Sequence, residues 1–419
     1  MLEIPSFFST ETSMKTLLII EPAFSGLDLI AAAYHLNFSV HIVSAQVDDR
    51  SIPEKYTAFI TAQHQVDTNS EAQLLEKVMA LHRQYQFAAV IPGSEYHVAI
   101  TARIVEHIDC LGLPRITAMA LRDKLHLHLL LEHSSIRTIP YAVIQSVSEI
   151  RAQVARVGLP AVIKPLAMAG SLGVKKVETL AEVEEAYLAI CENTLSELGH
   201  TMGKQALLEQ YIQGDEYSIE GWVDRNGIHI VSITQKQLGP EPYFVEIGHI
   251  VGASLPAKLE SDIRAYTETM IRQLNVNIGA FHLELRCDEQ GPVIIEIAGR
   301  IGGDCIAELV QLAKGVDLNK AMILSYLGEN YQADLTKRLA AVIFYYLPLG
   351  QRQYHTIEGI ERLKALSGFV RLHIIAKANV PIADSTTFLG RVAYAIFTNE
   401  TDDALKATLA TARQTLKFT

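Results

Sequence analysis

Glu284 and Glu296 each interrupt a short apolar run, and the cluster Asp288–Pro292 between them is rich in turn-forming residues. The pattern predicts two strands joined by a turn. Because side chains alternate along a strand, a loop of three or five residues would set the two carboxylates directly opposite each other, with Cβ atoms about 4.5–5.5 Å apart. Like charges that close repel, and burial raises the cost. A divalent cation removes the repulsion, and carboxylate oxygens suit Mg²⁺. We expect a metal site here, the alternative being a solvated strand edge.

The residues after Glu296 add a fixed positive charge and an open backbone. Arg300 lies in the run Gly299–Gly303, which also contains Gly302 and Gly303. A guanidinium beside a metal and exposed backbone groups favours binding of a phosphate or carboxylate. The sequence therefore predicts a metal–phosphate site at this end of the second strand.

A second phosphate-binding pattern lies upstream. Lys164 ends the predicted strand Ala161–Lys164 and directs a cation past the strand end. The following loop contains the small residues Gly170, Ser171 and Gly173, which let backbone N–H groups approach phosphate oxygens. The loop lacks the spacing of a P-loop, and by itself it could be an ordinary turn.

The segment from Glu209 to Ser218 could hold the rest of a nucleotide. A strand is expected to end at Glu209, and the chain then continues extended through Gln210, Tyr211 and Ile212, whose backbone could bond an adenine edge. Glu216 could accept hydrogen bonds from ribose hydroxyls. Both acids could equally be surface residues.

The first 110 or so residues alternate strand and helix patterns, which predicts a parallel α/β layer. Glu95 follows a predicted strand at Phe87–Pro92, at the edge where open α/β sheets bind ligands. The first strand–helix turn, Glu21–Gly26, lacks G-x-G-x-x-G, so dinucleotide binding is disfavoured. A helix over Ala118–His133 is expected to follow this layer.

Composition bounds the class of protein. The 419 residues predict two or three domains, and a net charge of −11 without a basic stripe argues against nucleic-acid binding. Four scattered cysteines predict reduced thiols, and the short apolar run after Met14 reads as a strand instead of a signal peptide. We expect a cytoplasmic protein without a membrane span.

The order of a strand lysine, a small-residue loop, the E-x-Y-I-x-G-x-E-Y-S segment and the paired-glutamate hairpin resembles the ATP-grasp superfamily. The resemblance implies three parts: an N-terminal Rossmann-like α/β domain (1–114), an ATP-grasp domain (115–330) with a mobile lid at about 138–208, and a small C-terminal α+β domain (331–419). It also implies ATP bound through Lys124 and Lys164, with Mg²⁺, two ions by expectation and Mn²⁺ as an alternative, on Glu284 and Glu296.

Within that superfamily, the runs Phe244–Ile250 and Glu296–Asp304 resemble carboxylate–amine ligases, in particular L-amino acid ligases that make dipeptides. By this resemblance Arg300 holds an acceptor carboxylate or acyl phosphate, and Glu246, His249 and Glu95 line the amino-acid pocket. Relatives usually have Asn where this chain has Ala298, so a ligand beside the metal is lost. His249 could instead be structural.

The expected reaction is ATP-driven amide formation between a small carboxylate and an amine, both amino acids by expectation, through an acyl phosphate. Glu246 or His249 could orient the amine or take its proton. The competing classes are a biotin carboxylase-type or purine-pathway carboxylase, a kinase, and a non-catalytic ATP-binding protein. Pairing of two copies through the N-terminal layer is a further expectation.

Overall fold

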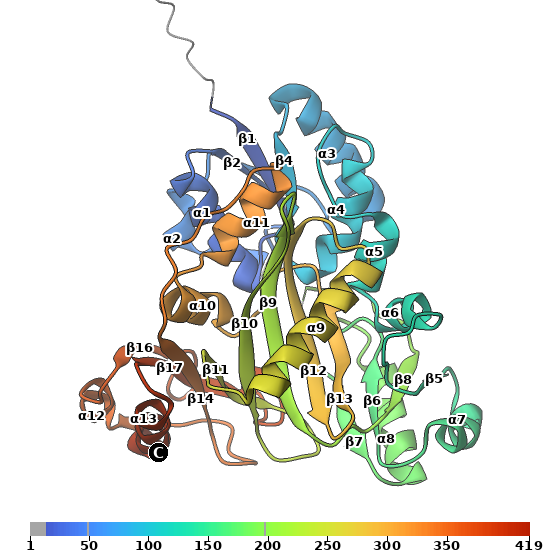
Figure 1. The fold of residues 1–419 in the computed structure, drawn as a ribbon, viewed down its shortest axis with the longest axis vertical. Helices are drawn as coiled ribbons and strands as arrows, with labels where there is room; N and C mark the ends of the chain where they lie inside the picture. The colour runs from blue at the N-terminus through green and yellow to red at the C-terminus, as the bar shows by residue number, and fades with distance from the viewer. Residues whose placement is uncertain (1–13, 48–49, 197) are drawn as a thin grey trace, which may run out of the picture.

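The computed structural model describes residues 14–47, 50–196 and 198–419, and within these ranges the chain forms three sheets of four or more strands (Figure 1). The helices carry the labels of Figure 1, and their bounds are α1 Asp28–His35, α2 Glu54–Thr57, α3 Glu71–Tyr85, α4 Val98–Val105, α5 Arg115–Ala120, α6 Lys124–Leu131, α7 Ile150–Val157, α8 Leu180–Glu192, α9 Ala257–Gln273, α10 Ile306–Lys314, α11 Leu318–Tyr326, α12 Ile360–Lys364 and α13 Asp402–Thr415.

The N-terminal layer is a parallel sheet of order β3-β2-β1-β4, with bounds β1 Thr16–Ile20, β2 Ser39–Ser44, β3 Ala62–Gln65 and β4 Ala89–Pro92. The predicted parallel layer is confirmed. The short edge strand β3 escaped prediction because its sequence, Ala-Gln-His-Gln, has no Val, Ile, Leu or aromatic residue to mark a buried strand. The carboxyl ends of β1 and β4 face the rest of the molecule (Figure 1), and Glu95 stands three residues after Pro92, the last residue of β4.

The central sheet is antiparallel and has the order β13-β12-β9-β10-β11-β14-β17-β16. Its strands are β9 Asp215–Asp224, β10 Gly227–Leu238, β11 Glu246–Val251, β12 Gly279–Asp288, β13 Gly291–Ala298, β14 Leu339–Tyr346, β16 Phe369–Ile374 and β17 Arg391–Asn399. Helix α9 crosses one face (Figure 1), and the fully buried Phe281 and Tyr326 belong to the large core beneath the sheet.

The lid is a separate antiparallel sheet of order β5-β8-β6-β7, with α7 and α8 packed on it. Its strands are β5 Tyr141–Ile144, β6 Ala161–Pro165, β7 Lys175–Val177 and β8 Ala206–Gln210. The lid has its own apolar cluster, which includes Ile144, Ile163 and Leu208. The segment predicted as a lid thus has an apolar core of its own, and its mobility stays a prediction.

The C-terminal residues do not form a sheet of their own beyond the small pair β15 Ile357–Glu358 and β18 Lys417–Phe418. Strand β14 pairs with β11, and β17 and β16 continue the same sheet outward. The chain from residue 339 onward is thus hydrogen-bonded into the sheet that carries Glu284 and Glu296.

The predicted single helix over 118–133 is wrong. Helix α5 ends at Ala120 and α6 begins at Lys124, because Asp123 caps α6 by accepting a hydrogen bond from the His126 amide at 3.0 Å. The break places Arg122 in the connection between the two helices. Within the described residues, no helix is long and apolar enough to cross a membrane.

Candidate active site

Glu284 and Glu296 are direct cross-strand partners on β12 and β13. The turn between these strands has two residues, not the three or five that would give this pairing in a regular hairpin, because Asp288 pairs with Gly291. A β-bulge next to Leu285 shifts the register by one residue and restores the parity. The predicted juxtaposition is therefore confirmed, although it arises by a different route.

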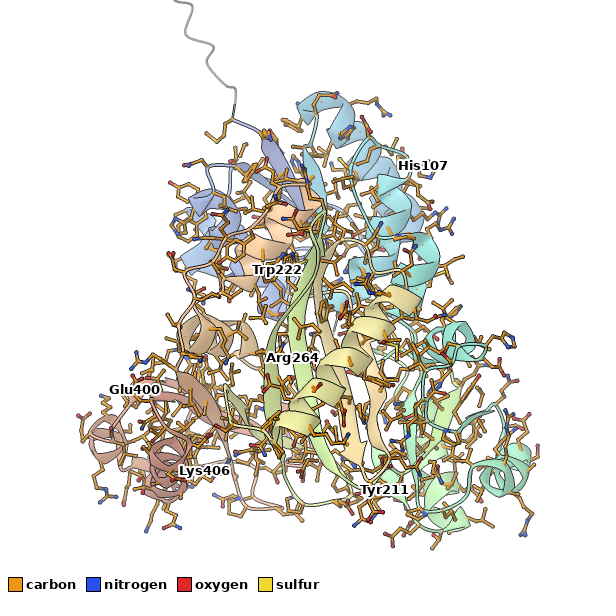
Figure 2. The ribbon with its side chains drawn as sticks, in the orientation of Figure 1. His107, Tyr211, Trp222, Arg264, Glu400 and Lys406 are labelled. Atoms are coloured by element: carbon orange, nitrogen blue, oxygen red, sulfur yellow. The ribbon has the colours of Figure 1, made fainter. Side chains whose placement is uncertain are left out.

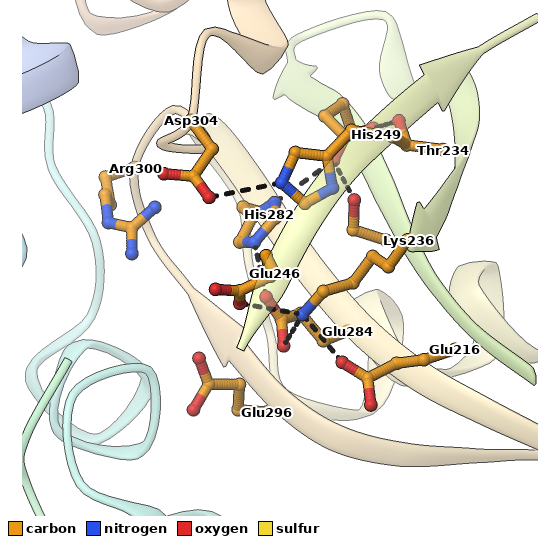
Figure 3. Close-up of polar contacts among 12 residues, drawn as sticks. Glu216, Thr234, Lys236, Glu246, His249, His282, Glu284, Glu296, Arg300 and Asp304 are labelled. Carbon is orange, nitrogen blue, oxygen red and sulfur yellow. Dashed lines mark hydrogen bonds and ion pairs between the residues drawn. The ribbon is translucent and has the colours of Figure 1, made fainter. Parts of the chain in front are cut away.

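Lysine side chains from other elements pair with both glutamates. Lys124 Nζ lies 3.2 Å from Glu296 Oε2, and Lys236 Nζ lies 2.7 Å from Glu284 Oε2. Lys236 also contacts Glu216 at 2.7 Å and Glu246 at 3.5 Å (Figure 3). Burial alone would lower the pKa of Lys236, but the three carboxylates raise it well above its usual value. This buried ammonium holds together acids from three other strands.

A buried polar network fixes the position of Glu284 from behind. His282 bonds Glu284 through Nε2 at 3.0 Å and Glu220 through Nδ1 at 3.1 Å. Glu220 also accepts hydrogen bonds from Ser218 at 2.6 Å and Ser232 at 2.8 Å. Burial would lower the pKa of His282, but the two glutamates raise it to about 9. The ring also explains Gly302, whose Cβ would lie 2.9 Å from His282 Nδ1.

The donor set fits a divalent metal that a nucleotide completes. No group of three or more His, Cys, Asp or Glu side chains that could hold a metal occurs among the described residues. Mg²⁺ commonly binds through one or two carboxylates together with water and substrate phosphates. Glu284 and Glu296 meet that requirement, and Lys236 and Lys124 pair with them.

A pocket lies between the lid and the central sheet, and it unites residues predicted separately as nucleotide and metal ligands. Its lining includes Lys124, Lys164, Ser171, Glu209, Gln210, Tyr211, Ile212, Glu216, Glu284 and Glu296. Figure 2 places Tyr211 at the base of the junction between lid and sheet. Two predicted residues of the small-residue loop, Gly170 and Gly173, lie outside this lining, next to Ser171 and Leu172, which belong to it.

The floor of the pocket on the lid side is a buried ion pair. Lys164 Nζ lies 2.6 Å from Glu209 Oε2, and His128 Nε2 lies 2.7 Å from Glu209 Oε1. Burial acts to raise the pKa of Glu209, but Lys164 and His128 outweigh it and lower this pKa to about 2. Glu209 thus holds Lys164 in place at the pocket wall.

The backbone beyond Glu209 is less open than predicted. The Tyr211 amide donates to the Pro160 carbonyl at 3.1 Å, and the Ile212 carbonyl accepts from Arg286 at 2.8 Å. Arg286 also pairs with Glu216 at 2.9 Å and lies 5.3 Å from the Tyr211 ring centroid. Arg286 and Lys236 therefore both engage Glu216, which leaves it less free to accept from a ribose than the sequence suggested.

The small-residue loop adopts the left-handed backbone conformation that glycine favours. Gly170, Ser171 and Gly173 all adopt positive φ, at 65°, 56° and 74°. A Cβ on Gly170 would lie 2.7 Å from the Phe388 ring, which comes from the C-terminal segment. Lys124 Nζ donates to the Met168 carbonyl at 2.9 Å at the start of this loop. The loop is held between the central and C-terminal parts of the chain.

A second charged cluster lies beside the first. Arg300 Nε donates to Glu95 Oε2 at 2.9 Å, a pairing between β4's end and the loop after β13. Burial would lower the pKa of Arg300, but Glu95 raises it. The structure therefore brings together these two predicted substrate-binding residues, which are far apart in the sequence.

Glu246 and His249 lie on β11, where an arginine from β17 joins them. Arg391 binds Asp304 through two hydrogen bonds of 2.5 and 2.6 Å and lies 3.5 Å from Glu246. His249 Nε2 lies 3.2 Å from Asp304 Oδ2, which fits an Nε2–H donated to the carboxylate. Burial raises the pKa of Glu246. In Figure 3, Arg300, Asp304, Glu246 and Glu296 surround one region next to Glu284.

The sequence interpretation missed Lys236, His282 and Arg391. Lys236 occurs in an alternating strand, and Arg391 opens a strand far along the chain, so neither spacing gives a signal. His282 could have been found, because it stands two residues before Glu284 and must share its face of the strand.

The comparisons with known proteins agree with this geometry. Residues 157–308 match the ATP-grasp domain. The solved structure of an L-amino acid ligase from Bacillus licheniformis superposes with a TM-score of 0.82 at 21% identity, covering 97% of this chain and 98% of that one. The chain has an ATP-grasp fold. The predicted fold class is thereby confirmed.

Two curated proteins are similar in sequence to this chain. Carnosine synthase 1 of Homo sapiens is 23% identical over 84% of this chain and 44% of its own length. The alanine–anticapsin ligase of Bacillus subtilis is 23% identical over 66% of this chain and 61% of its own length. The chain thus spans about half to three-fifths of these relatives. Enzymes with this fold use ATP and divalent metal ions, and these relatives fit the predicted class of ligase.

Proposed function

We propose that the protein is an ATP-dependent ligase that joins the carboxylate of one small molecule to the amine of another, with amino acids as the substrates. The observation that carries the proposal is the shared position of the two clusters. The Glu284–Glu296 pair lines the nucleotide pocket, and the Glu95–Arg300 pair adjoins it. A triphosphate end and a substrate carboxylate can therefore meet at one place. The named activities of the ligase relatives support the same reaction class.

In this reaction a substrate carboxylate oxygen attacks the γ-phosphorus of ATP, giving an acyl phosphate and ADP. The amine then attacks the acyl carbon, phosphate leaves, and the amine loses a proton. Glu284 and Glu296 would hold the divalent metal, two Mg²⁺ ions by expectation, and the metal would neutralise charge on the phosphates. Lys164 and Lys124 add fixed positive charge at the pocket wall. Arg300 orients the carboxylate, because its guanidinium can bind two oxygens in one plane.

The proton of the attacking amine needs an acceptor beside Arg300. Glu246 is suited to this, because burial raises the pKa of its carboxyl and moves it toward neutral pH. His249 donates to Asp304 and so orients that carboxylate toward the amine. Asp304 and Arg391 extend the predicted amino-acid pocket, and we assign them to the recognition of substrate charge.

The test is phosphate release measured with ATP, Mg²⁺ and every pair of the twenty amino acids, with mass spectrometry of the products. We expect release that needs two amino acids and yields a dipeptide mass. Turnover that needs bicarbonate and no amino acid would identify a carboxylase. A stable phosphorylated product without free phosphate would identify a kinase, and no ADP at all would leave only a binding protein.

Cytoplasmic localisation and a homodimer formed through the N-terminal layer are parts of the same proposal. Sedimentation analysis of the purified protein tests the second of these. A monomer at micromolar concentration would contradict it.

A further inference from the structure

The start of the small-residue loop is held by side chains from outside the lid. Arg122, in the connection between α5 and α6, donates to the carbonyl of Ala167. The amide of Ala169 lies 3.4 Å from the hydroxyl of Tyr96, which it approaches as a donor. The Lys124 amide donates to the Leu166 carbonyl at 3.0 Å. These three contacts, at residues 166, 167 and 169, fix the chain just before Gly170.

Arg122 and Tyr96 also contact each other and the substrate cluster. The Arg122 guanidinium lies 4.2 Å from the centroid of the Tyr96 ring, a cation–π contact. Arg122 Nη1 lies 3.9 Å from Glu95 Oε1, and the other Glu95 oxygen binds Arg300. Tyr96 follows Glu95 in the chain, so the backbone links the two residues as well.

A second part of the lid lies on the same tyrosine. The His200 ring stacks on Tyr96 with centroids 5.0 Å apart and an angle of 14° between the planes. Nearby, Asn69 donates to the Leu198 carbonyl at 3.0 Å. Leu198 and His200 belong to the loop between α8 and β8, and both contact the N-terminal layer. The lid therefore meets Tyr96 through two separate segments.

One hydrogen-bond donor in this arrangement has no acceptor in the described part of the chain. Arg122 Nη1 is buried and has no hydrogen-bond partner among the described residues. A buried guanidinium N–H without an acceptor is costly, and the nearest acid, Glu95, is beyond hydrogen-bond reach. A small shift of Glu95, such as a ligand on Arg300 would cause, can satisfy this donor.

We propose that Arg122 and Tyr96 are positioning residues that tie the small-residue loop of the lid to the Glu95–Arg300 pair. Occupation of the carboxylate site then orders the phosphate loop, and a loosened contact disturbs both halves of the site. The assignment of the loop to phosphate and of Arg300 to a carboxylate rests on the proposed function. The physical link between loop and ion pair does not depend on it.

Hydrogen exchange of the free, full-length protein tests the link directly. We expect Arg122→Leu and Tyr96→Leu to speed amide exchange in segment 166–174 about tenfold or more, because each removes an anchor of that segment. Arg115→Leu is the matched control, since Arg115 is an exposed residue on α5 whose loss changes the charge equally. Exchange in the two variants that equals the control would overturn the proposal.

Ligand response and kinetics supply a second test that general destabilisation would not mimic. With the twenty amino acids as a mixed probe and no nucleotide, exchange in 166–174 should slow in the wild type and stay unchanged in Arg122→Leu. In turnover assays we expect Arg122→Leu to raise the KM of both ATP and the carboxylate substrate and to lower kcat about 10- to 100-fold. Tyr96→Phe keeps the ring contacts with Arg122 and His200 but loses the hydroxyl that accepts from Ala169, so its kcat should lie between those of Tyr96→Leu and the wild type.

The outcomes separate the two hypotheses. If the variants loosen the loop but the wild type makes no amide, the link stands and the proposed function fails. A wild type that makes amide, but whose loop does not respond to amino acids or to the loss of Arg122, rules out the positioning role.

Discussion

Glu284 and Glu296 face each other across β12 and β13, and a lysine from outside the hairpin pairs with each of them. These ammonium groups place positive charge next to both carboxylates, so neither carboxylate is buried without a partner.

We expect Glu296→Gln to lower phosphate release about 100-fold or more, because the amide keeps the shape but loses the charge that a metal requires. Its side chain is 29% exposed, so the fold should tolerate the change. Glu289→Gln, in the turn of the same hairpin, is the matched control. Unchanged turnover in Glu296→Gln would remove the argument for a metal on this pair.

Lys236→Met should reduce the free energy of unfolding by about 3–5 kcal/mol, because it leaves buried carboxylates of Glu216 and Glu284 without their shared cation. Urea denaturation followed by circular dichroism measures this. Lys258→Met, at an 85% exposed side chain, is the control. Adding Glu216→Gln should recover part of the loss. If Lys236→Met were as stable as the control, the carboxyl groups of Glu216 and Glu284 would not both be ionised in the folded protein.

We expect the ionisation of Glu209 to contribute to the pH dependence of the free energy of unfolding. Its pKa is lowered to about 2 in the folded protein, so its contribution is complete above pH 4.5 and disappears as the pH falls from 4.5 to 2. The shift corresponds to about 3 kcal/mol. Glu209→Gln should therefore be less stable at pH 7 and lose less stability on acidification, whereas the exposed Glu184→Gln should follow the wild type. Parallel curves for wild type and Glu209→Gln would contradict this.

Gly170→Ala should raise the KM for ATP several-fold, because the residue has φ of 65° and its new Cβ would press on the Phe388 ring. Gly203→Ala is the control, since it lies in the same lid segment with nothing within 4 Å of its Cβ. Combining Gly170→Ala with Phe388→Leu should reverse only the part of the KM increase that comes from crowding between the new Cβ and the Phe388 ring. Equal KM values for the two glycine variants would show that the loop is not needed in this geometry.

Local signals carried much of the sequence interpretation. The acids at 284 and 296, in two short strands joined by a turn, were sufficient to predict that two carboxylates meet, and the small residues at 170, 171 and 173 predicted a loop between strands. The hairpin shows the limit of this reasoning, because a two-residue turn and a bulge gave the pairing that a longer loop was expected to give.

Contacts between distant segments were out of reach. Lys236 pairs with acids on β9, β11 and β12, and Arg391 meets Asp304 across 87 positions of sequence. No spacing within one strand encodes such meetings, since only the folded sheet defines them. The helix break at Asp123, in contrast, had a local signal in the sequence. Asp123 stands three residues before His126, whose amide it caps, but the apolar run around it favoured one continuous helix.

The pairing of β14 with β11 has a practical consequence for dissecting the molecule. A chain that ended near residue 330 would lack β14, so the backbone N–H and C=O groups of β11 on that side would be unpaired. Such an exposed edge strand can pair with strands of other molecules. It would also lose Phe388, whose ring lies next to Gly170, and Arg391, which binds Asp304. Exchanging the last ninety or so residues between related ligases should thus change the substrate specificity. Deleting them should give a protein that aggregates.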